Sequence, residues 1–243
     1  EATCRALFQG GVPARFPKLR FAFLEGGVAW GASLYASLLG VFEKRNVGAI
    51  EHLNPARLDR ELLVKLLREN GPDAIVERLD RLEEGMLLLN DPEDPPGSRD
   101  DFAASGVRSA ADIEEIFTSR FYFGCEADDP MNAMAFDRDK IPMKARLNAV
   151  FASDIGHWDV PDFREVLPEA WELREDGHLD ATDFRAFTCD NAIGLLAGSR
   201  PDFFEGTASP EPGACVPKGL PAIAAVETSA EFEEERLHPD SRA

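Results

Sequence analysis

Three stretches of the chain share one pattern of hydrophobic and polar positions. Each begins with a short, continuous apolar run, continues through a turn rich in glycine or acidic residues, and ends with helical spacing. The three stretches are residues 19–30, 119–136 and 148–163. Continuous apolar runs are typical of strands that are covered on both faces, as in parallel sheets flanked by helices. The pattern therefore predicts three βα units of an α/β fold with a parallel sheet.

A helical insertion of about 46–108 is expected between the first and second units. The two predicted strands are separated by about ninety residues, far more than a single crossover needs. Leucines at helical spacing after Pro55 predict one amphipathic helix, and the run from Ile75 to Leu89 predicts another. Steps of four and three also fit a coiled-coil seam, but only two heptads are present, so two packed amphipathic helices are the favoured interpretation.

Further boundaries follow from capping signals and composition. Ser109 and Asp112 have the spacing of a capping box, which predicts a helix that begins there. A last helix is expected at about 182–196, within a body that extends over 1–207. Residues 208–243 are rich in Pro, Ala, Ser and Glu, which predicts a disordered acidic tail.

The net charge and the spacing of the cysteines bear on the partners and the cellular location of the protein. The formal net charge of −19 argues against nucleic acid or an anionic membrane as a partner. No apolar run approaches the roughly 18 residues that a membrane span needs. The four cysteines show no CxxC spacing, which favours reduced thiols and a cytoplasmic location.

Acidic residues follow each predicted strand, where parallel βα folds bind their ligands. Glu25, Glu126 and Asp154 hold these positions, and carboxylates there can bind a divalent metal or act as a general base. Asp154 is the strongest functional candidate, while Glu126 stays open. Asp128 and Asp129 precede a helical run, so N-capping is their favoured role.

The few histidines and the absence of known catalytic motifs argue against several other kinds of site. No two of the four histidines are spaced as a metal-binding pair. His157 fits a loop hydrogen bond as well as it fits a site. No nucleophile elbow, phosphate loop or HExxH motif is present.

Three motifs resemble the amidohydrolase-related (amidohydrolase 2) family of the metal-dependent hydrolase superfamily. "FPKLRFAFLEGGVAW" resembles its sixth strand and turn, "VFASDIGHWD" its eighth strand, and "DFRAFTCDNAIGLLAGSRPDFFEGT" its closing helix. The similarity covers about 15–45 and 119–207. It implies a TIM-type (β/α)8 barrel, of which this chain carries the C-terminal part, about the last three βα units. The chain begins as if inside a helix, which agrees with that expectation.

The resemblance also implies a function. Family members are hydrolases of small molecules that use metal-activated water, with zinc as the expected metal. Asp154 would be a metal ligand or the base. Glu25, where many relatives have His, would be a replacement ligand, a substrate contact or a sign of altered metal use. His157, Glu126 and Trp30 would line the substrate pocket.

Two alternative functions remain open beside the hydrolase. Relatives include non-oxidative decarboxylases. An arginine in the substrate pocket, such as Arg120 or Arg138, would favour this alternative function. A non-catalytic barrel that serves as a binding surface is the other alternative. The family's remaining histidine ligands have no counterpart here, so residues 1–243 alone are expected to be inactive. A homo-oligomer is compatible with the sequence.

Overall fold

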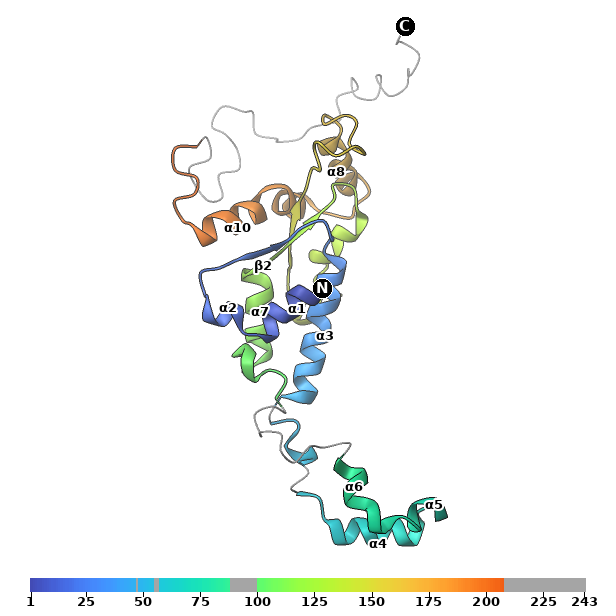
Figure 1. Ribbon diagram of the computed structural model, residues 1–243. Helices are drawn as coiled ribbons and strands as arrows, with labels where there is room; N and C mark the ends of the chain where they lie inside the picture. The colour runs from blue at the N-terminus through green and yellow to red at the C-terminus, as the bar shows by residue number, and fades with distance from the viewer. Residues whose placement is uncertain (47, 55–56, 88–99, 208–243) are drawn as a thin grey trace.

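Three parallel strands form one small sheet at the centre of the protein (Figure 1). The computed structural model describes residues 1–46, 48–54, 57–87 and 100–207. Strands β1 (Phe21–Phe23), β2 (Phe121–Cys125) and β3 (Asn148–Phe151) lie in the order β1-β2-β3, with all pairs parallel. Phe21 pairs with Phe121 and Phe123 pairs with Ala149. The mixed α/β class and the parallel sheet predicted from the three apolar runs are confirmed.

The other regular elements of the described chain are helices. Two helices precede β1: α1 (Ala2–Gln9) and α2 (Val12–Arg15). The helices between β1 and β2 are α3 (Ala29–Arg45), η1 (Glu51–Leu53), α4 (Arg60–Asn70), α5 (Asp73–Val76), η3 (Leu79–Arg81), α6 (Leu82–Leu87), η5 (Ala103–Ser105) and α7 (Ala110–Ser119). After β2 come η6 (Pro130–Ala135) and η7 (Pro142–Lys144), and after β3 come α8 (Val166–Glu175), α9 (Ala181–Arg185), η8 (Ala186–Asp190) and α10 (Asn191–Ser199).

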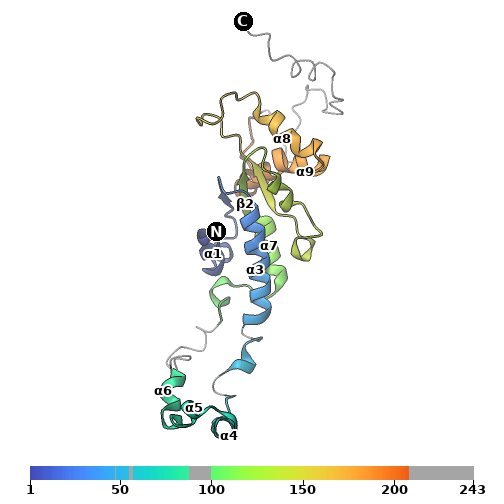
Figure 2. The same ribbon diagram turned by 90° about the vertical axis from the view of Figure 1, so that its right-hand side faces the viewer.

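An aromatic core joins the sheet to the helices that precede β2. Helices α3 and α7 run side by side beneath the strands, as both views show (Figures 1 and 2). Phe117 of α7 is fully buried, with its ring centroid 5.1 Å from Phe121, 5.2 Å from Tyr35 and 5.8 Å from Phe8. Burial of several large rings in one cluster is a major favourable contribution to folding. This cluster therefore fixes β2, and with it the sheet, on the helical layer.

The capping box predicted at the start of α7 is confirmed. Ser109 Oγ accepts a hydrogen bond from Asp112 N at 3.3 Å, and Asp112 Oδ2 accepts from Ser109 N at 2.9 Å. The backbone N–H of Arg108 also donates to Asp112, and this bond is the main reason that the pKa of Asp112 is lowered. Because the folded state favours the carboxylate, this interaction stabilises the protein at neutral pH and is lost as Asp112 becomes protonated in acid.

The described residues between β1 and β2 are largely helical, but the second leucine run is not one helix. The first leucine run forms α4, whereas the second is divided among α5, η3 and α6. The break lies at Arg78, whose φ of −121° and ψ of 18° leave the helical region. Isolated helices of this length are only marginally stable, so spacing alone does not keep the run continuous. The coiled-coil alternative over Ile75–Leu89 is therefore wrong for the described residues, and Leu89 lies outside them.

The closing helix also differs from the expected single helix. It comprises α9, the π-helical η8 and α10, and it begins after Asp180, whose side chain accepts from Asp183 N at 2.8 Å. Helix α8 was not predicted, because its moderate amphipathic pattern gave no clear signal. The predicted disordered tail, 208–243, lies outside the described residues.

Two cysteines are buried in the core as free thiols, as expected. Cys4 and Cys125 are both fully buried, and burial raises the pKa of each thiol to about 12. Cys189 takes part in a disulfide, so the expectation of four reduced thiols is wrong for that residue. Cys215 lies outside the described residues.

The buried thiols should resist alkylation in the folded protein. Thiolate is the reactive species, and a pKa near 12 leaves almost none of it at pH 8. We expect iodoacetamide to label neither Cys4 nor Cys125 in native protein and to label both in urea, as measured by peptide mass spectrometry. Labelling of either residue in the native protein at the rate found in urea would contradict its burial.

Candidate functional site

The acidic residues predicted to follow the strands all lie beyond the carboxyl edge of the sheet. Glu126 comes directly after β2, while Glu25 and Asp154 follow β1 and β3 by two and three residues. Backbone hydrogen bonds link the ends of the strands. Gly27 N donates to Gly124 O at 3.1 Å, and Ala152 N donates to Cys125 O at 2.9 Å. Because the strands are parallel and in register, three carboxylates of separate βα units share one edge.

Two of these acids have an unusual backbone conformation. Glu25 has φ of 60° and Asp154 has φ of 47°, and only four non-glycine residues in the described chain have positive φ. The left-handed region costs an ordinary L-residue about 1–2 kcal/mol, although Asp tolerates it better than Glu. Strained backbone is concentrated at functional sites. Glu25 and Asp154, the two residues that the sequence proposed as metal ligands, share this conformation with Met143 and Lys144.

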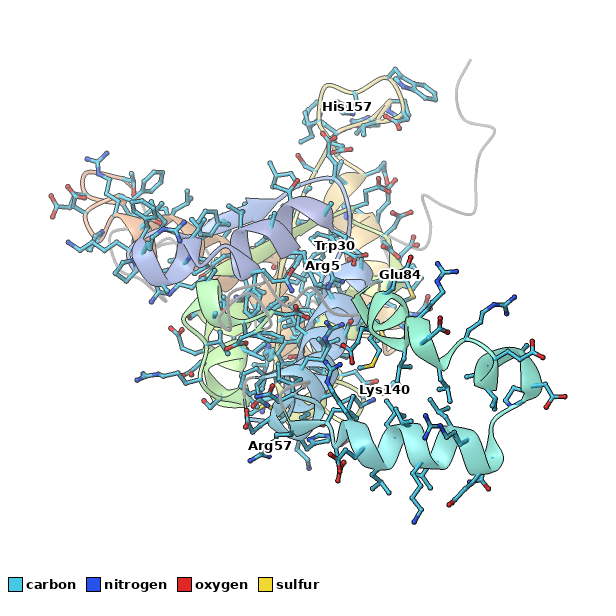
Figure 3. The ribbon with its side chains drawn as sticks, turned by 60° about the horizontal axis from the view of Figure 1, so that its bottom comes forward. Arg5, Trp30, Arg57, Glu84, Lys140 and His157 are labelled. Carbon is cyan, nitrogen blue, oxygen red and sulfur yellow. The ribbon has the colours of Figure 1, made fainter. Side chains whose placement is uncertain are left out.

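Asp154 and His157 form a local pair in the loop after β3. His157 Nδ1 lies 3.7 Å from Asp154 Oδ2, too long for a hydrogen bond, while His157 N donates to Asp154 O at 3.0 Å. The Asp154 side chain is 28% exposed and that of His157 is 55% exposed. In Figure 3, His157 lies on a loop that projects from the body of the molecule. A partly exposed carboxylate beside a half-exposed imidazole can exchange protons with a substrate or with water.

Asn132 supports the loop that carries Glu126. Its side chain is fully buried, and Nδ2 donates to Glu126 O at 2.7 Å, which leaves Oδ1 without a partner. Asp129 Oδ1 accepts from Met131 N at 2.8 Å, so the N-cap predicted for Asp129 is confirmed. The Glu126 side chain itself is exposed. Asn132 was missed in the sequence, where it is one polar residue in the apolar run "MNAMAF".

Trp30 lies beneath the first turn and within the aromatic core. Its ring centroid is 5.6 Å from that of Phe23 and 5.2 Å from that of Phe123. A Cβ at Gly26 would lie 2.9 Å from Trp30 Nε1, so a larger residue there would have to displace the indole ring. Figure 3 places Trp30 in the body, away from the loop of His157. These contacts give Trp30 a packing role; a role in a substrate pocket stays a prediction.

The arginines considered for a decarboxylase do not gather at the carboxyl edge. Arg120 directly precedes β2, at the opposite edge, and donates to Glu115 Oε1 at 3.4 Å. It lines a cavity of about 180 Å³ between α2 and α7. Arg138 interacts electrostatically with Asp183 of α9, whose carboxylate lies 3.0 Å from Arg146, near the start of β3. The edge with the three acids thus gains no positive charge from either arginine.

The donors at this edge fit a divalent metal in kind but not in number. Carboxylate oxygen and imidazole nitrogen are ordinary zinc ligands. Among the residues that the structure describes, however, no three His, Cys, Asp or Glu side chains lie together as a metal centre would require. These residues can contribute ligands but do not form a complete site.

Comparisons with known proteins give no family. The sequence matches no family model, and neither curated proteins nor solved structures show a significant similarity to it. Within the described ranges, no helix combines the length and apolar character needed to cross a bilayer. The amidohydrolase-related assignment and the cytoplasmic location therefore stay predictions.

Proposed function

We propose that this chain is the C-terminal part of an amidohydrolase-related (β/α)8 barrel and supplies one side of a metal-dependent hydrolase site for a small molecule. The observation that carries the proposal is the shared carboxyl edge of β1, β2 and β3 with Glu25, Glu126 and Asp154. Ligand binding at this edge is the rule for parallel βα folds. Leu24, directly after β1, is 70% exposed, an apolar side chain that further parts of a closed barrel would cover.

Asp154 has the central chemical role in this proposal. A divalent metal such as zinc, bound with further ligands from outside this edge, would supply Lewis acidity. The Asp154 carboxylate accepts the proton of the attacking water and returns it to the leaving group. The His157 imidazole lies 3.7 Å from that carboxylate, where it can orient the substrate, and Glu25 offers a second oxygen ligand from the turn after β1.

Hydrolysis and decarboxylation can be separated by one product assay. The full gene product that includes residues 1–243 is incubated with zinc and a panel of small amides, esters, lactones and aromatic carboxylic acids, and both hydrolysis products and released CO₂ are measured. Hydrolysis that is abolished by a chelator and restored by zinc is the expected result. Zinc-dependent CO₂ release without hydrolysis would assign the decarboxylase instead.

A non-catalytic barrel predicts a third outcome. In that case the protein retains no zinc after dialysis and yields neither product. This result would overturn the proposed enzyme. Residues 1–243 alone are expected to be inactive, because the described residues do not complete a metal centre.

A further inference from the structure

The segment that follows β3 exposes large apolar side chains to solvent. Trp158 is 93% exposed, Phe163 66%, Ile155 58% and Leu167 56%. These are four of the five most exposed large apolar side chains that the structure describes, and they lie within a stretch of thirteen residues. In Figure 3 the loop that carries His157 projects from the body of the molecule. Large apolar side chains that are exposed together mark interaction sites, whereas single ones scattered over a surface do not.

Backbone turns and one ion pair fix the shape of this segment. His157 N donates to Asp154 O at 3.0 Å, and Val160 N donates to His157 O at 3.3 Å. Val160 also packs against a small buried cluster that α8 helps to form. Arg164 Nε donates to Asp162 Oδ1 at 2.9 Å. A loop that is already ordered loses little conformational freedom when a partner binds, so more of the contact energy appears as affinity.

Trp158 differs from the other two tryptophans of the chain, which are packed. Trp30 contacts two phenylalanine rings of the core, and the ring centroid of Trp171 lies 5.1 Å from that of Phe184. Tryptophan is enriched among the residues that dominate binding energy in interfaces, because it buries a large area with few rotatable bonds. An indole that stays almost wholly in water therefore contributes nothing to the core and is suited to bind a partner.

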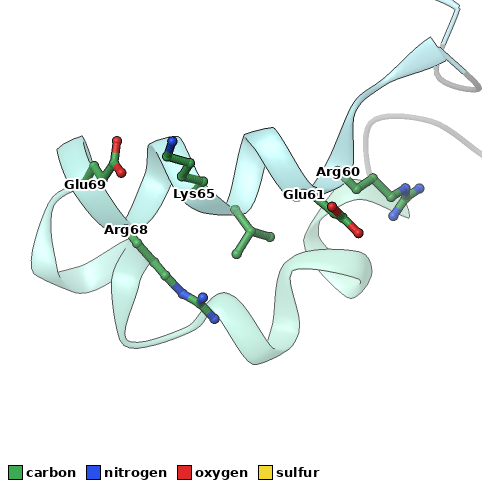
Figure 4. A pocket seen from close by; sticks show the side chains of 6 residues that line it. Arg60, Glu61, Lys65, Arg68 and Glu69 are labelled. Atoms are coloured by element: carbon green, nitrogen blue, oxygen red, sulfur yellow. The ribbon is translucent and has the colours of Figure 1, made fainter.

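The hollow along α4 lacks this combination of features. It has a volume of about 510 Å³ and is lined by three basic and two acidic side chains, with Val64 as the one apolar residue (Figure 4). Exposed charged side chains of both signs are well solvated and contribute little when they pair. The segment after β3 is therefore the stronger candidate for an interaction surface.

The charge around the exposed apolar side chains restricts the kind of partner. Residues 153–169 contain five acidic residues and one arginine, and that arginine is bonded to Asp162. A second copy of the chain would bring the same negative charge to the contact. Segments that bind a bilayer surface carry lysine and arginine beside their apolar residues, which is the reverse of this pattern. The complementary partner is a segment that offers basic side chains next to apolar ones.

We propose that residues 155–167 form a docking surface for a basic, apolar segment of a partner protein, with Trp158 at its centre. Apolar side chains of the partner cover Trp158 and Phe163, while its lysines or arginines meet the surrounding carboxylates. An apolar centre with a polar rim is the usual arrangement of an interface, and a cation can also lie on the face of the indole. The surface is small, so the expected dissociation constant is about 10–100 μM. This inference does not depend on the proposed enzymatic function.

Synthetic peptides test the chemistry of the partner. A fluorescein-labelled peptide of about twelve alternating lysines and leucines, which reaches about 40 Å when extended, is titrated with the full chain. Salt at about 0.15 M screens long-range attraction, and fluorescence anisotropy gives the dissociation constant. We expect saturable binding. A lysine–serine peptide of the same length should bind at least about tenfold more weakly, because it cannot cover the indole, and a glutamate–leucine peptide should not bind.

Matched variants test whether the peptide binds at Trp158. Trp158→Ala should raise the dissociation constant of the lysine–leucine peptide about tenfold, and the exposure of this side chain means that its loss should leave the fold intact. Phe16→Ala removes an aromatic side chain that is 52% exposed before β1 and should change nothing. Glu169→Lys should raise the dissociation constant about threefold, whereas Glu77→Lys, the same charge change on the insertion, should not.

Tryptophan fluorescence locates the contact directly. Saturating lysine–leucine peptide should shift the emission to shorter wavelength, and Trp158→Phe should abolish this shift. No binding of that peptide up to about 1 mM, equal affinity for the lysine–serine peptide, or an affinity that Trp158→Ala leaves unchanged would overturn the proposal. So would self-association through Trp158 in sedimentation velocity, or Trp158-dependent binding to phosphatidylcholine vesicles, because either result assigns the surface to another occupant.

Discussion

Replacement of Phe117 by alanine is expected to lower the free energy of unfolding by about 3–5 kcal/mol. Phe117 is completely buried. Its ring packs against the rings of Phe8, Tyr35 and Phe121, which belong to α1, α3 and β2. Truncation leaves a cavity at the point where these elements meet. Three separate backbone segments would have to move to fill it, so little relaxation is expected.

Urea unfolding followed by far-UV circular dichroism measures this effect. Phe163→Ala is the matched control, because Phe163 is 66% exposed and its loss should cost less than about 1 kcal/mol. If Phe117→Ala fails to fold, Phe117→Leu gives a milder test, with an expected loss of about 1–2 kcal/mol. A loss for Phe117→Ala no larger than that for Phe163→Ala would show that the aromatic cluster does not hold the sheet on its helices.

The parts of this fold that the sequence predicts are those with strong local signals. The three strands are continuous apolar runs followed by polar turns, and β2 is buried at every position, as expected for the central strand of a covered parallel sheet. The α7 capping box is equally local, since Ser109 and Asp112 satisfy each other's backbone groups. Such features need no knowledge of distant residues.

Features set by packing were not predictable in the same way. The run from Ile75 to Leu89 has ideal spacing, yet it breaks at Arg78, whose φ and ψ leave the helical region, and none of the side chains of α5 and η3 is buried. Trp30 looks like a pocket residue from its place after the Gly-Gly turn, but its contacts with Phe23 and Phe123 depend on the register of β1 and β2. The left-handed backbone at Glu25 and Asp154 also has no signal in residue type alone.

That backbone conformation decides how Asp154 should be tested. Alanine at φ of 47° would add strain of about 1–2 kcal/mol, so a loss of activity in Asp154→Ala would have two explanations. Asparagine has the shape of aspartate and is well tolerated in the left-handed region. Asp154→Asn therefore removes the charge and basicity of the side chain and leaves the turn in place.

In the full gene product, Asp154→Asn should lower kcat/KM for hydrolysis by about 10²–10⁴-fold, with a melting temperature close to that of the wild type. The physical reason is that an amide cannot take a proton from water, although it fills the same space between Ser153 and Ile155. Asp159→Asn, an exposed acid five residues further along the same loop, should keep nearly full activity. Activity that survives in Asp154→Asn, with the protein folded and zinc present, would mean that the base of this reaction lies elsewhere. Equal losses in both variants would point instead to the general negative charge of the loop, because only a specific proton acceptor distinguishes Asp154 from its neighbour.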